Sequence, residues 1–230
     1  MTLRLLDASR KPGTPRAVRH VRRSLALCVA LLAAGAAGGC TVGEGEGAVH
    51  SDDLRAGECF RGAFDLEPTF FGSIPYRESQ LIRLQHRDDI VENSDGLQVL
   101  VLNTDRIRAS LGKAQRVGLP PEVTPPGVPI RPDPDPPIVQ VTLYLHETCH
   151  GRNVALSAVS GTITFAHLFS GDPTEGAAAE KLTEATLDVM VADPRDQPPE
   201  GGPVPLDKQS RVTGNFRFYF QRGQPAQPFP

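Results

Sequence analysis

The residues with the clearest chemical potential are two histidines with a glutamate between them, in the segment His146-Glu147-Thr148-Cys149-His150. This order fits the pattern H-E-x-x-H, in which two histidines share a zinc ion and the glutamate polarises the attacking water. The pattern can hold one metal only on a helix, because four residues of a strand span about 13 Å. The local structure around Glu147 therefore decides what the segment can do.

The residues before this motif favour a strand. Apolar and polar side chains alternate over 139–145, and Val, Thr and Tyr are common in strands. Gly151 follows directly and would end a helix there. We therefore predict a strand over 139–149, with no catalytic residue, no metal and no other cofactor. The alternative is a zinc-dependent hydrolase with His146 and His150 as ligands and Glu147 as the base.

A second chemically marked residue is Cys40. Basic residues in 16–23 precede an apolar run over 25–34, and small residues follow up to Cys40, which is the order of a secretory signal. The apolar run is shorter than the roughly 20 residues that a transmembrane helix needs. Ala37, Gly38 and Gly39 resemble the lipobox of bacterial lipoproteins, with Ala37 where that pattern usually has leucine. The resemblance implies a helical signal peptide, 1–39, that is cleaved, and a lipid on Cys40.

The resemblance also gives expectations about location and partners. In bacterial lipoproteins an aspartate after the lipidated cysteine often marks retention at the inner membrane, and Thr41 stands there instead, which favours the outer membrane. Arg22-Arg23-Ser24-Leu25 partly matches a twin-arginine export signal, so that route and the general route both stay open. The expected partners are the membrane, through the lipid on Cys40, and another protein of the cell envelope.

The charge of the exported part argues against nucleic acid as a partner. The whole chain has 24 Lys and Arg against 27 Asp and Glu. The leader holds seven of the basic residues and one of the acidic ones, so the mature chain carries a net charge of −9. An acidic surface repels phosphate backbones.

Two cysteines remain after the leader and the lipid site are set aside. They are Cys59 and Cys149, an even pair in a chain with an export signal, which predicts a disulfide bond. The alternative is two buried free thiols. A bond between them would close a loop of about 90 residues and stabilise the fold by roughly 4–5 kcal/mol on the chain-entropy model.

The rest of the chain predicts a mostly β fold. Short alternating segments, joined by turns and without a long amphipathic helix, indicate about seven strands in an antiparallel sandwich or a barrel-like meander. The clearest strand is 211–221, where Val212, Phe216 and Phe218 share one face. The segment 62–71, which contains Pro68, reads as an edge strand.

The domain organisation follows from composition. We expect a flexible tether over 40–57, rich in glycine at its start, and one β domain over 58–223. A proline-rich loop over 118–137, with nine prolines in twenty residues, interrupts the domain, and 224–230 form a tail.

The order of these strands and loops resembles β-rich envelope lipoproteins of unknown role, including a Gly-x-Phe-x-Phe strand at Gly214-Asn-Phe-Arg-Phe218. The combined expectation is a lipid-anchored envelope domain with a non-enzymatic binding or structural role.

Overall fold

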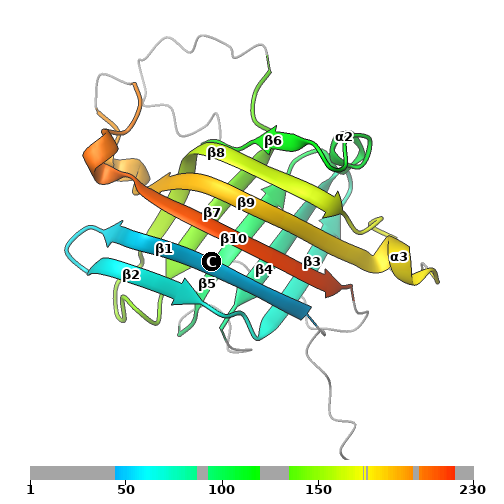
Figure 1. The fold of residues 1–230 in the computed structure, drawn as a ribbon, viewed down its shortest axis with the longest axis horizontal. Helices are drawn as coiled ribbons and strands as arrows, with labels where there is room; N and C mark the ends of the chain where they lie inside the picture. Colours follow the sequence, from blue (N-terminus) through cyan, green and yellow to red (C-terminus); the bar gives the residue numbers. More distant parts are fainter. Residues whose placement is uncertain are drawn as a thin grey trace, which may run out of the picture. The chain divides into compact units, whose positions relative to one another are not determined.

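Ten strands form a single antiparallel sheet in the computed structural model (Figure 1). The structure describes residues 45–86, 93–119, 135–172, 174, 176–198 and 202–220. The sheet order is β2-β1-β10-β9-β8-β7-β5-β4-β3, and β6 pairs with β8 beside this path. The strands are β1 (Gly45–Ala56), β2 (Phe60–Leu66), β3 (Phe70–Tyr76), β4 (Ser79–Gln85), β5 (Asp95–Val101), β6 (Ala114–Arg116), β7 (Val139–Leu145), β8 (Ala155–His167), β9 (Leu182–Ala192) and β10 (Ser210–Tyr219). The predicted mostly β, antiparallel fold class is confirmed, although the described residues form ten strands where about seven were expected.

The sheet curls so that its two halves face each other. In Figure 1, β1, β2, β8, β9 and β10 lie in front of β3, β4, β5 and β7. The turning point is β8, whose first half pairs with β7 and whose second half pairs with β6. Its ladder with β9 shifts register between Ala158 and Ser160, and Gly161 follows with φ of 113°. A Cβ at Gly161 would lie 2.4 Å from the Asp188 carbonyl oxygen, so only glycine fits this bend.

The inward faces of the two halves make one hydrophobic core. Alternate residues of β10 point into it, as the sequence predicts, with Val212, Phe216 and Phe218 all at most 1% exposed. The facing strands contribute Ile82 and Leu84 of β4, and both are fully buried. Burial of this apolar surface, at roughly 25 cal/mol per Å², is the main force that holds the two halves together.

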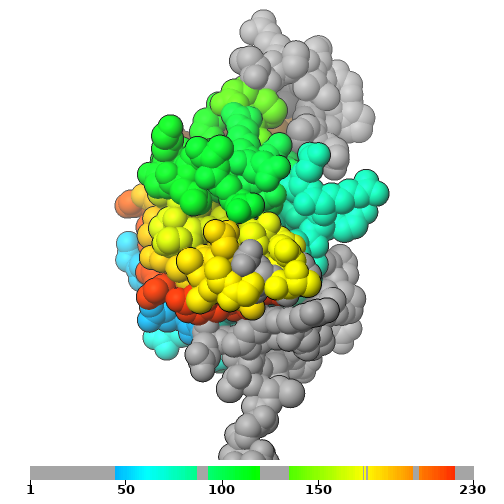
Figure 2. Space-filling model, turned by 90° about the vertical axis from the view of Figure 1, so that its right-hand side faces the viewer, coloured from blue at the N-terminus to red at the C-terminus, as the bar shows by residue number. Residues whose placement is uncertain are grey.

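In the described part of the chain, helical structure is confined to short segments between strands. These are α2 (Thr104–Arg108), α3 (Ala178–Lys181) and the 3-10 turns η2 (Pro194–Asp196) and η3 (Leu206–Lys208). Figure 2 shows the green surface of α2 and β6 above the yellow surface that contains α3, and Arg108 of α2 pairs with Glu180 of α3 at 3.4 Å. Among the described residues no helix has the length and apolarity to cross a membrane.

The predicted tether over 40–57 is wrong from Gly45 onward, because this segment forms β1 between β2 and β10. Its glycines have a packing role. A Cβ at Gly45 would lie 2.6 Å from the ring of Phe71, and the ring centroids of Phe71 and Phe218 are 5.7 Å apart. Glycine therefore lets β1 pass close to an aromatic contact of the core.

The predicted edge segment over 62–71 contains parts of two strands. Pro68 lies in the link between β2 and β3, and these are the two outermost strands of the sheet. The edge position is right, although the sequence gives no sign that the chain passes from one edge to the other.

Several predictions lie outside the described residues. They are the signal peptide, 1–39, the lipid site Cys40, residues 120–134 of the proline-rich loop and the tail, 224–230. The described residues all belong to one compact unit, which comprises 42–230.

Candidate functional site

The H-E-x-x-H segment lies in the turn between β7 and β8. The sequence predicts a strand over 139–149, but the strand ends at Leu145. The prediction is therefore wrong for its last four residues. The backbone N–H of Cys149 donates to the carbonyl of Leu145 at 2.9 Å, which closes a single turn. Gly151 then adopts φ of 74°. A helix of the kind that zinc hydrolases need is not formed by these residues.

A buried carboxylate holds this turn in place. Asp95, at the start of β5, is 6% exposed and lies opposite Leu145 in the β5–β7 ladder. It accepts hydrogen bonds from the backbone N–H groups of Glu147 at 2.9 Å and Thr148 at 3.0 Å, and from the Thr148 hydroxyl. A carboxylate with three donors satisfies turn amides that would otherwise lack partners.

A disulfide bond fixes the same turn from the other side. Cys59, in the turn between β1 and β2, is bonded to Cys149, with the Cα atoms 5.7 Å apart. The predicted pairing is therefore confirmed. The crosslink joins the two halves of the sheet through cysteines that are 90 residues apart in the chain.

The three motif residues point to different neighbours. Glu147 Oε2 lies 3.3 Å from His86 Nδ1, whereas His146 Nε2 lies 3.3 Å from Asn153 Oδ1. His150 is exposed. In the described ranges, no three His, Cys, Asp or Glu side chains come together as a metal-binding group. The three residues fit one motif in the sequence, but in the turn their side chains do not converge on one site.

A groove of 490 Å³ runs between this turn and the outermost strand β2. Its position depends on the curl of the sheet, which brings β2 opposite the ends of β4, β5 and β7. The β2 side of the lining is aromatic and aliphatic apart from Asp65, and three of the other five lining residues are acidic. The lining residues are Phe60, Ala63, Phe64, Asp65, Leu66, Glu67, His86, Asp95, Glu147 and Thr148.

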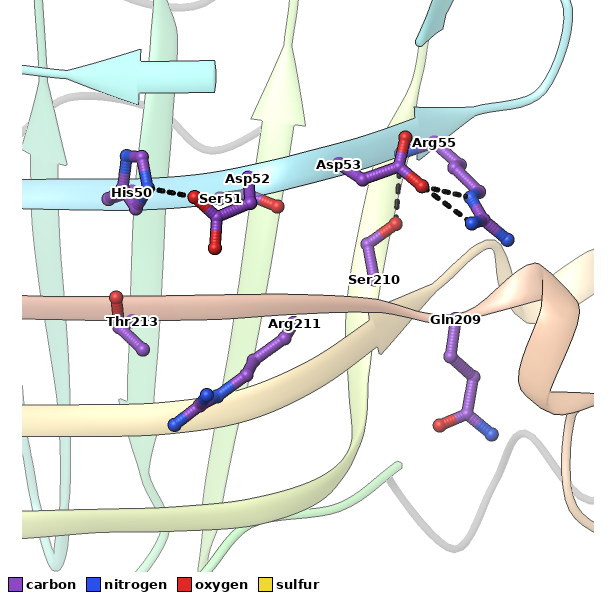
Figure 3. Close-up of a pocket in the computed structure, with 9 residues that line it drawn as sticks. All are labelled: His50, Ser51, Asp52, Asp53, Arg55, Gln209, Ser210, Arg211 and Thr213. Carbon is purple, nitrogen blue, oxygen red and sulfur yellow. Dashed lines mark hydrogen bonds and ion pairs between the residues drawn. The ribbon is translucent and has the colours of Figure 1, made fainter. Parts of the chain in front are cut away.

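A second pocket, of 370 Å³, lies between two neighbouring strands of the front half of the sheet, β1 and β10 (Figure 3). The two strands pair as far as His50 and Thr213 and then separate. Beyond that point the backbone N–H of Arg55 donates to Ser210 Oγ at 2.9 Å. The cause is a bulge, because β1 shifts register against β2 between Ser51 and Leu54.

The charges beside this second pocket are largely neutralised within the protein. Arg211 donates from Nε and Nη2 to the two carboxylate oxygens of Asp188, at 2.8 and 2.7 Å, and lowers the pKa of that carboxyl. Arg55 donates to Asp53 at 2.9 Å and lowers the pKa of Asp53 in the same way.

His50 lies at the same pocket, between two carboxylates. Its ring nitrogens lie 2.6 Å from Asp65 Oδ1 and 3.0 Å from Asp52 Oδ1. The hydrogen bonds to Asp65 and then Asp52 raise the pKa of His50 above its ordinary value. The charged imidazolium is therefore favoured at this position, on the solvent-exposed side of β1.

Sequence reasoning missed both the groove and the second pocket. The signal for β1 was present in the alternation of Val49 and Ser51 with His50 and Asp52, but the glycines before it indicated a tether. Comparisons with known protein families, curated proteins and solved structures find no significant match to this chain.

Proposed function

We propose that this chain is a bacterial lipoprotein that a lipid on Cys40 anchors in the cell envelope, at the outer membrane, and that its β domain has a binding or structural role. The observation that carries the proposal is the bond between Cys59 and Cys149. A structural disulfide forms and persists in an oxidising compartment, which is where the leader over 1–39 would send the chain.

The same bond supports a role other than catalysis. Cys149 stands inside the H-E-x-x-H segment, and its sulfur is used to join two turns. The turn's backbone is held by Asp95, and Glu147 faces His86. These contacts give the segment a structural purpose, because they connect the β1–β2 turn to the opposite half of the sheet.

Replacing the lipid-bearing residue tests the anchoring. Cys40→Ser should move the protein from the detergent-extracted membrane fraction to the soluble envelope fraction, because the thiol that takes the lipid is gone. Cys28→Ser is the matched control, since it removes another thiol of the leader and should leave the protein with the membrane. Unchanged membrane association of Cys40→Ser would reject the proposed anchor.

A further inference from the structure

The outer edge of β2 is open in the described part of the chain. The strand forms a ladder with β1 on one side, and among the described residues no strand forms a ladder with it on the other side. Figure 1 shows β2 as the outermost strand of the front half. Ala63, at its centre, is exposed and lines the 490 Å³ groove, whose other wall is formed by the β7–β8 turn and the neighbouring ends of β4 and β5. An open edge of this kind is a template for pairing with another strand.

The side chains of β2 alternate regularly between its two faces. Arg61, Ala63 and Asp65 are exposed, whereas Phe64 and Leu66 are buried. The register shift beside β2 falls within β1, between Ser51 and Leu54, so β2 itself remains continuous over seven residues. The exposed face thus presents a positive charge, a small residue and a negative charge in that order.

This order is complementary to itself when the strand is turned by 180°. In an antiparallel pair of β2 strands with Ala63 opposite Ala63, Arg61 of each copy lies opposite Asp65 of the other. On the inner face, Gly62 then lies opposite Phe64, which leaves room for the ring. Directly opposite charges and aromatic side chains are the pairs that stabilise antiparallel strands.

We propose that two copies of this chain associate through their β2 strands, in an antiparallel, two-fold symmetric pair centred on Ala63. This register pairs the whole strand from Phe60 to Leu66. A shift of the register would shorten the pairing and remove the Arg61–Asp65 contacts. Symmetric pairs that use the same surface twice are the commonest form of protein oligomer.

The side chains of the two charges that would cross the dyad remain largely exposed within one copy. Arg61 Nε lies 3.7 Å from Asp53, and the side chains of Arg61 and Asp65 are 73% and 72% exposed. Asp65 also accepts from His50, through one of its two oxygens. Exposed pairs of this kind contribute little, so both side chains can still engage a second copy. A lipid anchor would further raise the effective concentration of copies on one membrane.

Cysteine crosslinking in envelope membranes tests the dyad. In the full chain carrying Ala63→Cys, the two new thiols would face each other across the axis, at a separation that a disulfide can bridge. Copper phenanthroline should oxidise them to a covalent dimer. Tyr76→Cys, at the exposed end of β3, is the matched control for random collision. The covalent dimer should be at least about fivefold more abundant for Ala63→Cys. Equal yields would overturn the proposal.

Reversing the charges in two variants of the protein tests the register of the proposed strand pair. In the Ala63→Cys background, Asp65→Arg alone and Arg61→Asp alone should each lower the dimer yield by about tenfold, because like charges then meet across the pair. Co-expression of the two variants should restore the yield as a mixed dimer, since each supplies the charge that the other lacks. Failure of the mixture to recover would reject this pairing.

Hydrogen exchange of the unaltered full chain gives an independent readout. Amides of 60–66 should exchange more slowly as the protein concentration rises, while those of β3 should not change. Protection that does not depend on concentration would contradict self-association. These results are separate from the Cys40→Ser fractionation, because a monomeric chain could still be lipid-anchored.

Discussion

The two outer strands of the sheet protect their edges in different ways. β3 contains Pro75, whose nitrogen cannot donate a hydrogen bond, so a further strand cannot pair with it regularly. β2 has no proline between Phe60 and Leu66, and carries charges of both signs on its exposed face. Proline blocks any strand, whereas a charge pattern rejects most strands and accepts one with the reverse pattern. On our proposal β2 is the edge that accepts a partner, whereas Pro75 hinders regular pairing at β3.

The two edges also differ in what holds them to the rest of the sheet. The turn that leads into β2 is tied to the β7–β8 turn by the Cys59–Cys149 bond and, through that turn, to Asp95. β3 is held by its seven-residue ladder with β4. Removing the ties of β2 one at a time should therefore affect the two edges unequally.

The largest effect should follow loss of the disulfide. Cys59→Ala should lower the free energy of unfolding by about 2–5 kcal/mol, because the unfolded chain is no longer constrained by a loop of 90 residues. Denaturant titration measures the loss, and hydrogen exchange should accelerate more over 60–66 than over 70–76. Cys59→Ala with Cys149→Ala should match the single variant. An unchanged unfolding midpoint would show that the bond contributes nothing to stability.

A smaller loss is expected from Asp95→Ala. The substitution removes the acceptor of two backbone N–H groups and one hydroxyl in the β7–β8 turn, which should cost about 2 kcal/mol. Asp95→Asn keeps the shape and one acceptor oxygen, so it should cost less. Denaturant midpoints of both variants, measured with the disulfide intact, make the comparison. Equal stability of the Ala and Asn variants would show that the hydrogen bonds do not matter.

The strands of the core could be predicted because alternation is a local signal, and the disulfide because only two cysteines remain after the leader and the lipid site are set aside. The alternating Val212, Phe216 and Phe218 already identify the inner face of β10. The strand β1 could not be predicted in this way. Its glycines leave room for the rings of Phe71 and Phe218, and those residues are distant in the chain. A glycine that relieves crowding and a glycine in a flexible linker look the same in sequence.

The geometry of the candidate sites depends on contacts between residues that are far apart in the chain. The turn after Leu145 is set by Asp95, about fifty residues earlier, so alternation over 139–145 extended the strand too far. The groove beside β2 and the edge itself depend on the order of strands in the sheet. The charge order of Arg61 and Asp65 is visible in the sequence, but it becomes meaningful only once β2 is known to lie at an edge.

A change of pH should loosen the β2 side more than the β3 side. The folded-state pKa of His50 is raised above the ordinary 6.5 by Asp65 and Asp52. Its stabilising contribution is therefore fully present below about pH 6.5 and is lost as the pH rises through the folded pKa. His50→Gln should remove the fall of the urea midpoint that accompanies a rise in pH above about 6.5. Identical profiles for the variant and the natural protein would contradict the assignment, and an NMR titration of His50 would give its pKa directly.

The smallest effects are expected at the histidines of the H-E-x-x-H segment. His146 contacts Asn153 and lies with its ring 5.4 Å from that of Tyr144, and His150 is exposed. His146→Ala and His150→Ala should each change the free energy of unfolding by no more than about 0.5 kcal/mol, as most surface substitutions do. EDTA should leave the melting temperature unchanged, because the segment's stability comes from Asp95 and the disulfide. The measurement that separates the two readings of this turn is metal analysis of the purified chain: one tightly bound zinc per chain, lost on either histidine substitution and accompanied by a hydrolytic activity lost in Glu147→Gln, would establish the zinc hydrolase and reject the binding role.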